Sequence, residues 1–197
     1  MIKSNELYKV ICASKYFTSD EIKNIYAQGY NDFGENQVQS MIEKMDVLKD
    51  LNITWHFIGH LQTNKVKYMI NRIDMLHTLD RISLAKMIQK HANHKIDCMI
   101  QVNISQETQK SGVLLENLAE FLIEIKNYDK INIVGFMTMG VFDDIERTND
   151  IFHQMNILKE KYQYPYLSMG MTDDYEVAIK HHATHLRIGR LFKTMIK

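Results

Sequence analysis

The sequence contains few cysteines, the residues that form disulfides and cysteine zinc sites. Its 197 residues include two cysteines, Cys12 and Cys98, which lie in separate apolar runs without Cys-x-x-Cys spacing. This usage excludes a disulfide framework and a cysteine zinc site, and it is typical of a reducing compartment. We therefore expect both thiols to be small, buried hydrophobic side chains.

The sequence also lacks a net charge, since Lys plus Arg and Asp plus Glu each number 24. The charges are interspersed, so no basic stripe predicts a nucleic-acid groove, and nucleic acid is not an expected partner. No apolar stretch approaches the length that crosses a bilayer, and residues 1–6 contain no apolar signal segment. We expect a cytoplasmic protein without a membrane partner.

Proline and glycine are scarce, with one proline and eight glycines, so no obvious linker divides the chain. We therefore expect one domain over residues 1–197. What the chain does contain is a regular alternation of apolar runs of strand length with segments of helical periodicity. Eight such alternations predict an α/β fold, a (β/α)8 TIM-like barrel, rather than an open doubly wound sheet.

The expected strands are residues 8–14, 31–35, 54–59, 74–78, 98–104, 133–137, 166–169 and 185–188. A helix is expected after each strand except the last. The first of these helices has a capping box from Thr18 to Glu21 and Gly29 just past its end. The helix after the fifth strand is expected to include Leu114 on its apolar face.

Lys15 follows the first expected strand, at the end where barrel enzymes keep their active sites. Partial desolvation there would make the amine easier to deprotonate, and a neutral amine can attack a carbonyl to form a Schiff base. The alternative is a surface lysine that merely follows a strand. Lys65, Lys67 and Lys110 are further amines, for which we expect solvation at the surface.

Two loops that contain glycine follow the last two expected strands. Ser168 and Gly170 belong to the first loop, and Gly189 and Arg190 to the second. In barrels these two loops often bind phosphate, although each sequence is also compatible with ordinary turn chemistry. Because the first and eighth strands close a barrel, a phosphate site there would neighbour Lys15. A reactive lysine beside a phosphate clamp suits pyridoxal 5′-phosphate (PLP).

Arg187 lies on the eighth expected strand. If it faces inward, it can only donate to the pyridine nitrogen of PLP, and the ring would then be a weak electron sink. The alternative is an arginine that faces the helices and binds a carboxylate there.

Three longer motifs resemble those of the pyridoxal phosphate homeostasis proteins: GENQVQ at 34–39, WHFIGHLQTNK at 55–65 and SMGMTDD at 168–174. Shorter matches are KSG at 110–112, GFM at 135–137 and RIG at 187–189, and the similarity runs from Lys9 to Phe192. The resemblance implies a barrel of the alanine racemase N-terminal type and a monomer that binds PLP. It also implies a carrier that supplies PLP to apo-enzymes.

The same resemblance assigns roles to single residues. It implies that Lys15 forms the Schiff base, that Ser168 and the amides of Gly189 and Arg190 contact the phosphate, that Arg187 meets the ring nitrogen, and that Asn36 lines the ring. The chain departs from the family at its start, where residues 1–7 replace a helix. We therefore expect apolar surface at the seam between the first and last strands, exposed or covered by a partner. Arg190 replaces a small or hydroxyl residue, so a guanidinium would join the amides at the phosphate.

Three functions are compatible with these features. The first is the PLP carrier, and the second is a PLP-dependent amino-acid racemase of low activity that uses Lys15 and a second group such as His56. The third is a Schiff-base enzyme for a phosphorylated sugar, without PLP. Racemisation needs an acid/base group on the opposite face of the cofactor, and alanine racemase takes it from another domain and subunit. The carrier is therefore favoured, and His56 is alternatively a hydrogen-bonded core residue.

Overall fold

The computed structural model describes residues 2–107, 111–194 and 196, and within them eight parallel strands close into a barrel. In order around the barrel they are β1 (Lys9–Ala13), β2 (Asp32–Glu35), β3 (Thr54–Phe57), β4 (Met75–Leu79), β5 (Ile96–Asn103), β7 (Ile131–Met137), β8 (Tyr166–Ser168) and β9 (His185–Ile188). Pairing of β1 with β9 and of β4 with β5 completes the ring. The predicted (β/α)8 barrel is confirmed.

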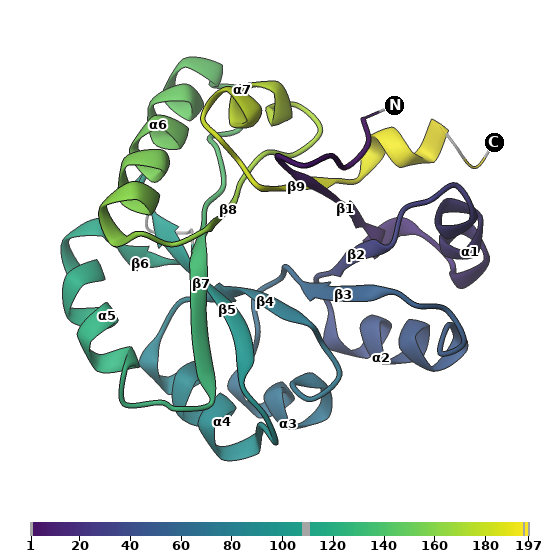
Figure 1. Ribbon diagram of the computed structural model, residues 1–197, viewed down its shortest axis with the longest axis horizontal. Helices are drawn as coiled ribbons and strands as arrows, with labels where there is room; N and C mark the ends of the chain where they lie inside the picture. The colour runs from purple at the N-terminus through teal and green to yellow at the C-terminus, as the bar shows by residue number, and fades with distance from the viewer. Residues whose placement is uncertain (1, 108–110, 195, 197) are drawn as a thin grey trace.

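Helices surround the strands on the outside, as Figure 1 shows. They are α1 (Ser19–Ala27), α2 (Val38–Val47), α3 (Val66–Met69), α4 (Ile82–His91), α5 (Leu118–Ile125), α6 (Ile145–Tyr162) and α7 (Tyr175–Lys180), with 3-10 turns η1 (Ser14–Tyr16), η2 (Thr63–Lys65), η3 (Leu115–Asn117) and η4 (Arg190–Thr194). None of the helices in the described part of the chain combines the length and hydropathy that a bilayer crossing needs.

The ends of α1 follow the sequence rules. Thr18 Oγ1 accepts the Glu21 N–H, and the Glu21 carboxylate accepts the Thr18 N–H at 2.7 Å, so the capping box is formed. Gly29 follows the helix with a φ of +91°, a value that glycine adopts without strain. The helix expected around Leu114 is wrong at its start, because Leu114 belongs to a two-residue strand, β6 (Val113–Leu114), which pairs with β5.

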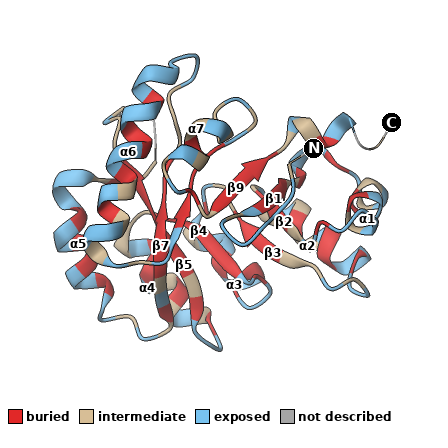
Figure 2. Cartoon of the chain, turned by 45° about the horizontal axis from the view of Figure 1, so that its top comes forward, coloured by how far each residue is buried: buried red, intermediate tan, exposed pale blue. Residues whose placement is uncertain are grey.

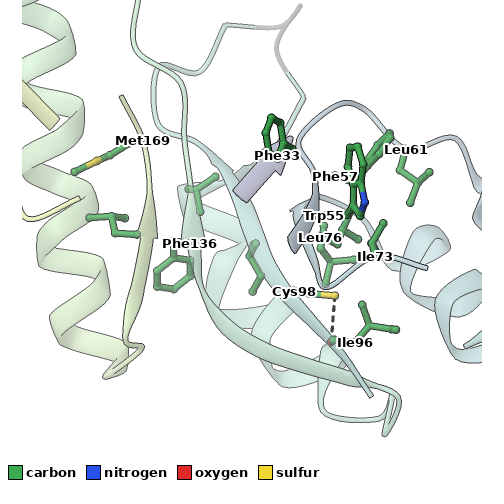
Figure 3. Close-up of a cluster of buried hydrophobic side chains, with 14 of the residues drawn as sticks. Phe33, Trp55, Phe57, Leu61, Ile73, Leu76, Ile96, Cys98, Phe136 and Met169 are labelled. Carbon is green, nitrogen blue, oxygen red and sulfur yellow. Dashed lines mark hydrogen bonds between the residues drawn. The ribbon is translucent and has the colours of Figure 1, made fainter. Parts of the chain in front are cut away.

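The main core lies between the barrel and its helices, where strand residues that face outward meet the apolar faces of the helices. Figure 2 shows the strands as almost wholly buried, and Figure 3 shows one part of this layer, including Phe33, Phe57, Leu76 and Phe136. A smaller apolar cluster is formed by Met75, Met99, Val134 and Met137, with Met139 packed against it.

Both cysteines are free and fully buried, as predicted. Burial raises the pKa of each thiol far above its usual value. Cys12 and Cys98 are therefore inert packing residues in this fold.

The seam between β1 and β9 is covered, so the expectation of exposed apolar surface there is wrong. The register partners Val10 and Leu186 are both buried. The Tyr30 hydroxyl donates to the Ile2 carbonyl at 3.0 Å and holds the segment before β1 in place. Phe192 of η4 is also buried, and its ring meets that of Tyr30 edge to face at 4.8 Å. Figure 1 shows the segment before β1 and the turn η4 beside this seam.

Candidate functional site

A cavity of about 500 Å³ opens at the carboxyl ends of the barrel strands. Its lining residues are Ala13, Lys15, Tyr16, Asn36, Ile58, Gly59, His60, Thr78, Gln101, Ser111, Met137, Met139, Met171, Thr172, Asp173, Arg187, Gly189 and Arg190. The size is typical of a small-molecule site, and the lining combines methionines with a few charged groups. A neighbouring hollow of about 550 Å³ lies over α2 and η2 and shares Asn36 and His60 with this cavity.

Lys15 reaches the cavity from η1, the turn that follows β1. The partial burial expected for its amine is not found, because the residue is exposed. Its Nζ lies 4.7 Å from the centre of the Tyr16 ring, and Lys193 Nζ lies 5.0 Å from the same ring. The ammonium therefore rests against an aromatic face at the rim of the cavity.

A buried ion pair holds the turn that carries Lys15. Lys44 Nζ donates to the Glu35 carboxylate and also to the Ser14 carbonyl, the latter at 2.8 Å. The Ser14 hydroxyl donates to Glu35 Oε1 at 3.0 Å. Glu35 in turn accepts the Asn36 N–H at 3.3 Å. The Glu35 carboxylate thus helps to fix the backbone at Ser14, next to Lys15, and at Asn36.

Arg187 points into the barrel, as strand alternation allows, and not toward the helices. Its Nη1 donates to Ser168 Oγ at 2.7 Å, and its Nη2 donates to the Thr138 carbonyl at 2.9 Å. Burial lowers the pKa of Arg187 to about 10, against an opposing effect of the Asp174 carboxylate. The guanidinium is therefore still charged at neutral pH and presents a fixed donor to the cavity.

The last residue of β8, Ser168, and the residues of the loop after it lie in different surroundings. Ser168 is fully buried and lies outside the cavity lining, with its hydroxyl bonded to Arg187 and His77. Gly170 has a φ of +93°, and a Cβ there would come within 2.6 Å of the Ala178 side chain, so this glycine serves close packing. Thr172 lines the cavity and was missed.

The loop after β9 brings Gly189 and Arg190 to the cavity beside Lys15. A Cβ at Gly189 would meet only Ala13, at 3.6 Å, so open space lies beyond it. The Arg190 guanidinium pairs with the Asp173 carboxylate across the cavity rim, and both side chains are exposed. A ligand anion here would compete with Asp173 for Arg190.

Asn36 and His60 line the side of the cavity formed by the loops after β2 and β3. The half-exposed His60 ring lies 3.5 Å from Asp80 Oδ2 and 3.3 Å from Ser111 Oγ through Nδ1. Among the other lysines considered, Lys65 and Lys67 are exposed beside Tyr68, as predicted. Lys110 lies outside the described residues.

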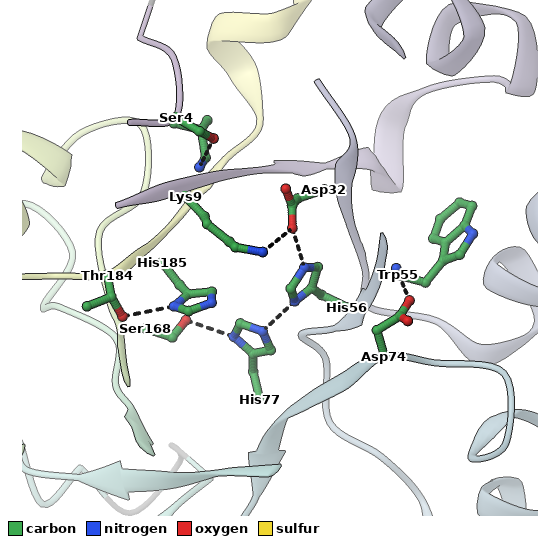
Figure 4. A network of polar contacts seen from close by, with 11 residues as sticks. Ser4, Lys9, Asp32, Trp55, His56, Asp74, His77, Ser168, Thr184 and His185 are labelled. Atoms are coloured by element: carbon green, nitrogen blue, oxygen red, sulfur yellow. Dashed lines mark hydrogen bonds and ion pairs between the residues drawn. The ribbon is translucent and has the colours of Figure 1, made fainter. Parts of the chain in front are cut away.

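His56 is a hydrogen-bonded core residue inside the barrel, below the cavity. Its Nδ1 lies 2.9 Å from His77 Nε2, and its Nε2 lies 3.1 Å from Asp32 Oδ1. Figure 4 shows these groups as one network with His185 and Ser168 close by. The spacing of single histidines on different strands gives no sequence signal for such a cluster.

Two of these histidines are held neutral by their surroundings. Burial lowers the pKa of His77 well below its usual range, and positive charge on nearby groups lowers it further. Burial, with smaller effects of His56 and Lys9, lowers the pKa of His185 to about 3. Burial raises the pKa of Asp32, but the hydrogen bond with His56 and the charge of Lys9 outweigh it, so the net pKa is lowered.

Comparison with known proteins agrees with this architecture. The family model of the alanine racemase N-terminal domain matches residues 14–192. The pyridoxal phosphate homeostasis protein of Aquifex aeolicus is 40% identical over 193 residues, which cover 93% of this chain and 85% of the relative. The protein of the same name from Escherichia coli is 32% identical, with 95% of this chain and 85% of the relative covered.

Solved structures show the same fold. PipY of Synechococcus elongatus without PLP superposes with a TM-score of 0.90 at 28% identity, covering 95% of this chain and 93% of that one. PipY with PLP bound superposes with a TM-score of 0.86 at 26% identity, covering 96% and 93%. By sequence and by fold, the chain belongs to the pyridoxal phosphate homeostasis protein family.

Proposed function

We propose that this protein binds PLP as a Schiff base on Lys15, takes part in intracellular PLP homeostasis, and supplies the cofactor to apo-enzymes. The observation that carries the proposal is the convergence of Lys15, Arg187, Thr172 and Gly189 on one cavity of about 500 Å³. These residues come from the carboxyl ends of β1, β8 and β9, so the first strand of the barrel and its last two strands meet at the cavity. The PLP-bound structure of the relative PipY supports the choice of ligand.

The groups around the cavity match the chemistry of PLP. A primary amine is needed for the aldehyde, and Lys15 supplies it at the rim. Hydroxyl, guanidinium and backbone groups at Thr172, Arg190 and Gly189 would hold the phosphate. We therefore propose Thr172, and not Ser168, as the hydroxyl that contacts the phosphate. The Ser168 Oγ is hydrogen-bonded to Arg187 and His77 below the cavity.

Arg187 limits what a bound cofactor can do. When bound, PLP supplies an electron-accepting ring whose strength depends on the proton at its nitrogen. A guanidinium can only donate, so Arg187 would leave that nitrogen without a proton. Its two bonds to Ser168 and Thr138 fix the guanidinium in place. A weak electron sink suits a protein that holds the cofactor without turning over a substrate.

The cavity also favours a carrier over a racemase. Racemisation needs acid/base groups on both faces of the cofactor. His56, which was one candidate for the second group, is 1% exposed and bonded to His77 and Asp32 inside the barrel. His60 does line the cavity, but its ring is turned to Asp80 and Ser111.

Borohydride reduction followed by peptide mapping tests the proposal. The protein is mixed with PLP, reduced and digested, and the phosphopyridoxyl group is expected on Lys15. Lys15→Arg keeps the charge and should abolish the adduct, whereas the matched surface variant Lys65→Arg should retain it. An adduct on another lysine, or none in the parent protein, would contradict the proposal. Exchange of the α-hydrogen of alanine with solvent deuterium would instead indicate the racemase.

We extend the proposal to location, assembly and partners. Two free buried thiols suit the reducing cytoplasm, and the covered seam suits a single-domain monomer. Transfer is tested by mixing the PLP-loaded protein with a PLP-requiring apo-enzyme and a scavenger of free PLP. Activity should return despite the scavenger if transfer is direct, and it should stay absent if PLP is first released.

A further inference from the structure

A continuous chain of hydrogen bonds runs through the barrel from the cavity to its opposite end. Arg187 Nη1 donates to Ser168 Oγ at 2.7 Å, and Ser168 Oγ lies 2.9 Å from His77 Nδ1. His77 Nε2 lies 2.9 Å from His56 Nδ1, and His56 Nε2 lies 3.1 Å from Asp32 Oδ1. The five side chains come from five different strands, and Figure 4 shows the part from Ser168 to Asp32.

The chemistry of the five groups gives the chain one direction when both imidazoles are neutral. Arginine can only donate, and the ionised Asp32 can only accept. His56 must therefore donate from Nε2 and accept at Nδ1, so His77 must donate from Nε2. His77 then accepts a hydrogen bond at Nδ1, and the donor of that bond is the Ser168 hydroxyl. Each member donates to the next, from Arg187 to Asp32.

This direction matters at Arg187. The Ser168 hydroxyl can accept from Arg187 in a fixed orientation because its own proton is committed to His77. Arg187 Nη2 is anchored separately on the Thr138 carbonyl at 2.9 Å. With one bond on each terminal nitrogen, the plane of the guanidinium is set before any ligand arrives. The remaining N–H groups are those that can face the cavity.

We propose that His77 is a positioning residue which, through Ser168, orients Arg187 for the ring nitrogen of a bound PLP. The inference rests on the proposed function and adds His77, a residue that does not line the cavity. The role differs from simple core packing, because it depends on an acceptor at the position of His77 Nδ1 and not on the size of the ring.

The barrel supplies a matched control. His185 lies in the same interior layer, with its ring centre 5.8 Å from that of His77, and both residues are almost completely buried. His185 Nδ1 lies 2.9 Å from Thr184 Oγ1, outside the series of hydrogen bonds that reaches Arg187. A general packing role would make the two histidines equivalent, whereas the positioning role would not.

The experiment compares His77→Leu, His77→Asn, Ser168→Ala and His185→Leu in the full chain. For each variant, the dissociation constant of PLP and the absorbance spectrum of the bound cofactor are measured. We expect about 10-fold weaker binding and a changed spectrum in His77→Leu and Ser168→Ala, as for loss of one charge-assisted contact. His77→Asn, of similar size to leucine but with an amide oxygen near the place of Nδ1, should recover most of the binding. His185→Leu should match the parent protein.

A second measurement needs no ligand. Nitrogen-15 NMR of the histidine rings in the unliganded parent protein reports which nitrogen carries the proton. We expect a proton on Nε2 and none on Nδ1 in both His56 and His77. A protonated His77 Nδ1 would overturn the proposal, as would equal effects of His77→Leu and His185→Leu. If the parent protein fails to bind PLP at all, the proposed function fails. The NMR result alone then decides whether the chain of hydrogen bonds has the proposed direction.

Discussion

Replacing Lys44 by methionine tests whether the buried ion pair beneath the Lys15 turn holds the site together. The Glu35 side chain is 0% exposed and that of Lys44 is 11% exposed. In Lys44→Met the carboxylate keeps the Ser14 hydroxyl but loses its cation, and the Ser14 carbonyl loses its donor. Methionine retains an unbranched apolar stem, so the change removes charge and hydrogen bonds more than volume.

The magnitude follows from the burial of the remaining charge. Removing one partner of a buried pair costs about 3–5 kcal/mol, because the other charge is left without compensation. That is a large share of the roughly 5–15 kcal/mol by which domains are stable. In the double variant Glu35→Gln with Lys44→Met no charge is stranded, so its cost should be well below the sum of the two single changes.

Urea unfolding at pH 7, followed by the fluorescence of the single tryptophan, Trp55, measures these differences. The matched control is Lys23→Met, which breaks an exposed pair with Asp20 at 2.9 Å and should change stability by no more than about 0.5 kcal/mol. A loss below about 1 kcal/mol in Lys44→Met, or simple additivity in the double variant, would refute the reasoning.

Three further predictions concern acid stability, a glycine and the phosphate. Because burial lowers the pKa of His185 to about 3, the unfolded chain binds more protons there below about pH 6.5. His185 should therefore contribute fully above that pH and lower stability by about 1.4 kcal/mol per pH unit between pH 6 and 4, with the buried His77 adding a loss of its own. His185→Leu should make the slope shallower by the His185 share, and an unchanged slope would contradict the assignment. Gly170→Ala should cost about 1–3 kcal/mol in urea unfolding, more than Gly29→Ala, which shares the positive φ but has nothing within 4 Å of its Cβ. Thr172→Ala should weaken binding of PLP about 10-fold but leave binding of pyridoxal unchanged, and equal weakening of both would show that the hydroxyl does not serve the phosphate.

Much of the fold could be predicted, because burial on both sides of a parallel strand leaves a continuous apolar run. The last strand was predicted at residues 185–188 and is found at His185–Ile188. Leu114 was assigned wrongly because a two-residue strand is too short to show a period of its own, and Leu114 lies at helical spacing from Leu118. The cover over the β1–β9 seam depends on Phe192, which meets Tyr30 from the opposite end of the sequence.

Which way a site residue faces could be predicted on the strands, where side chains alternate between two sides, but not in the loops. Alternation along β9 allows Arg187 to face the barrel interior, and it does. Ser168 ends β8 and Thr172 lies in the loop after it, where no period applies, so spacing alone could not tell which hydroxyl meets the phosphate. Their difference arises from His77, which takes the Ser168 hydroxyl from another strand. Such a contact spans 91 positions and has no local signature.

The cavity lies across the join between β1 and β9, the first and last strands of the barrel. Lys9 pairs with His185 in the register of β1 and β9, and the two loops that leave these strands carry Lys15 and Gly189. A nascent chain that stops before β9 has an open barrel and half of a binding site. A product that ends before β9 would lack Arg187 and Gly189, and we expect that it would not bind PLP.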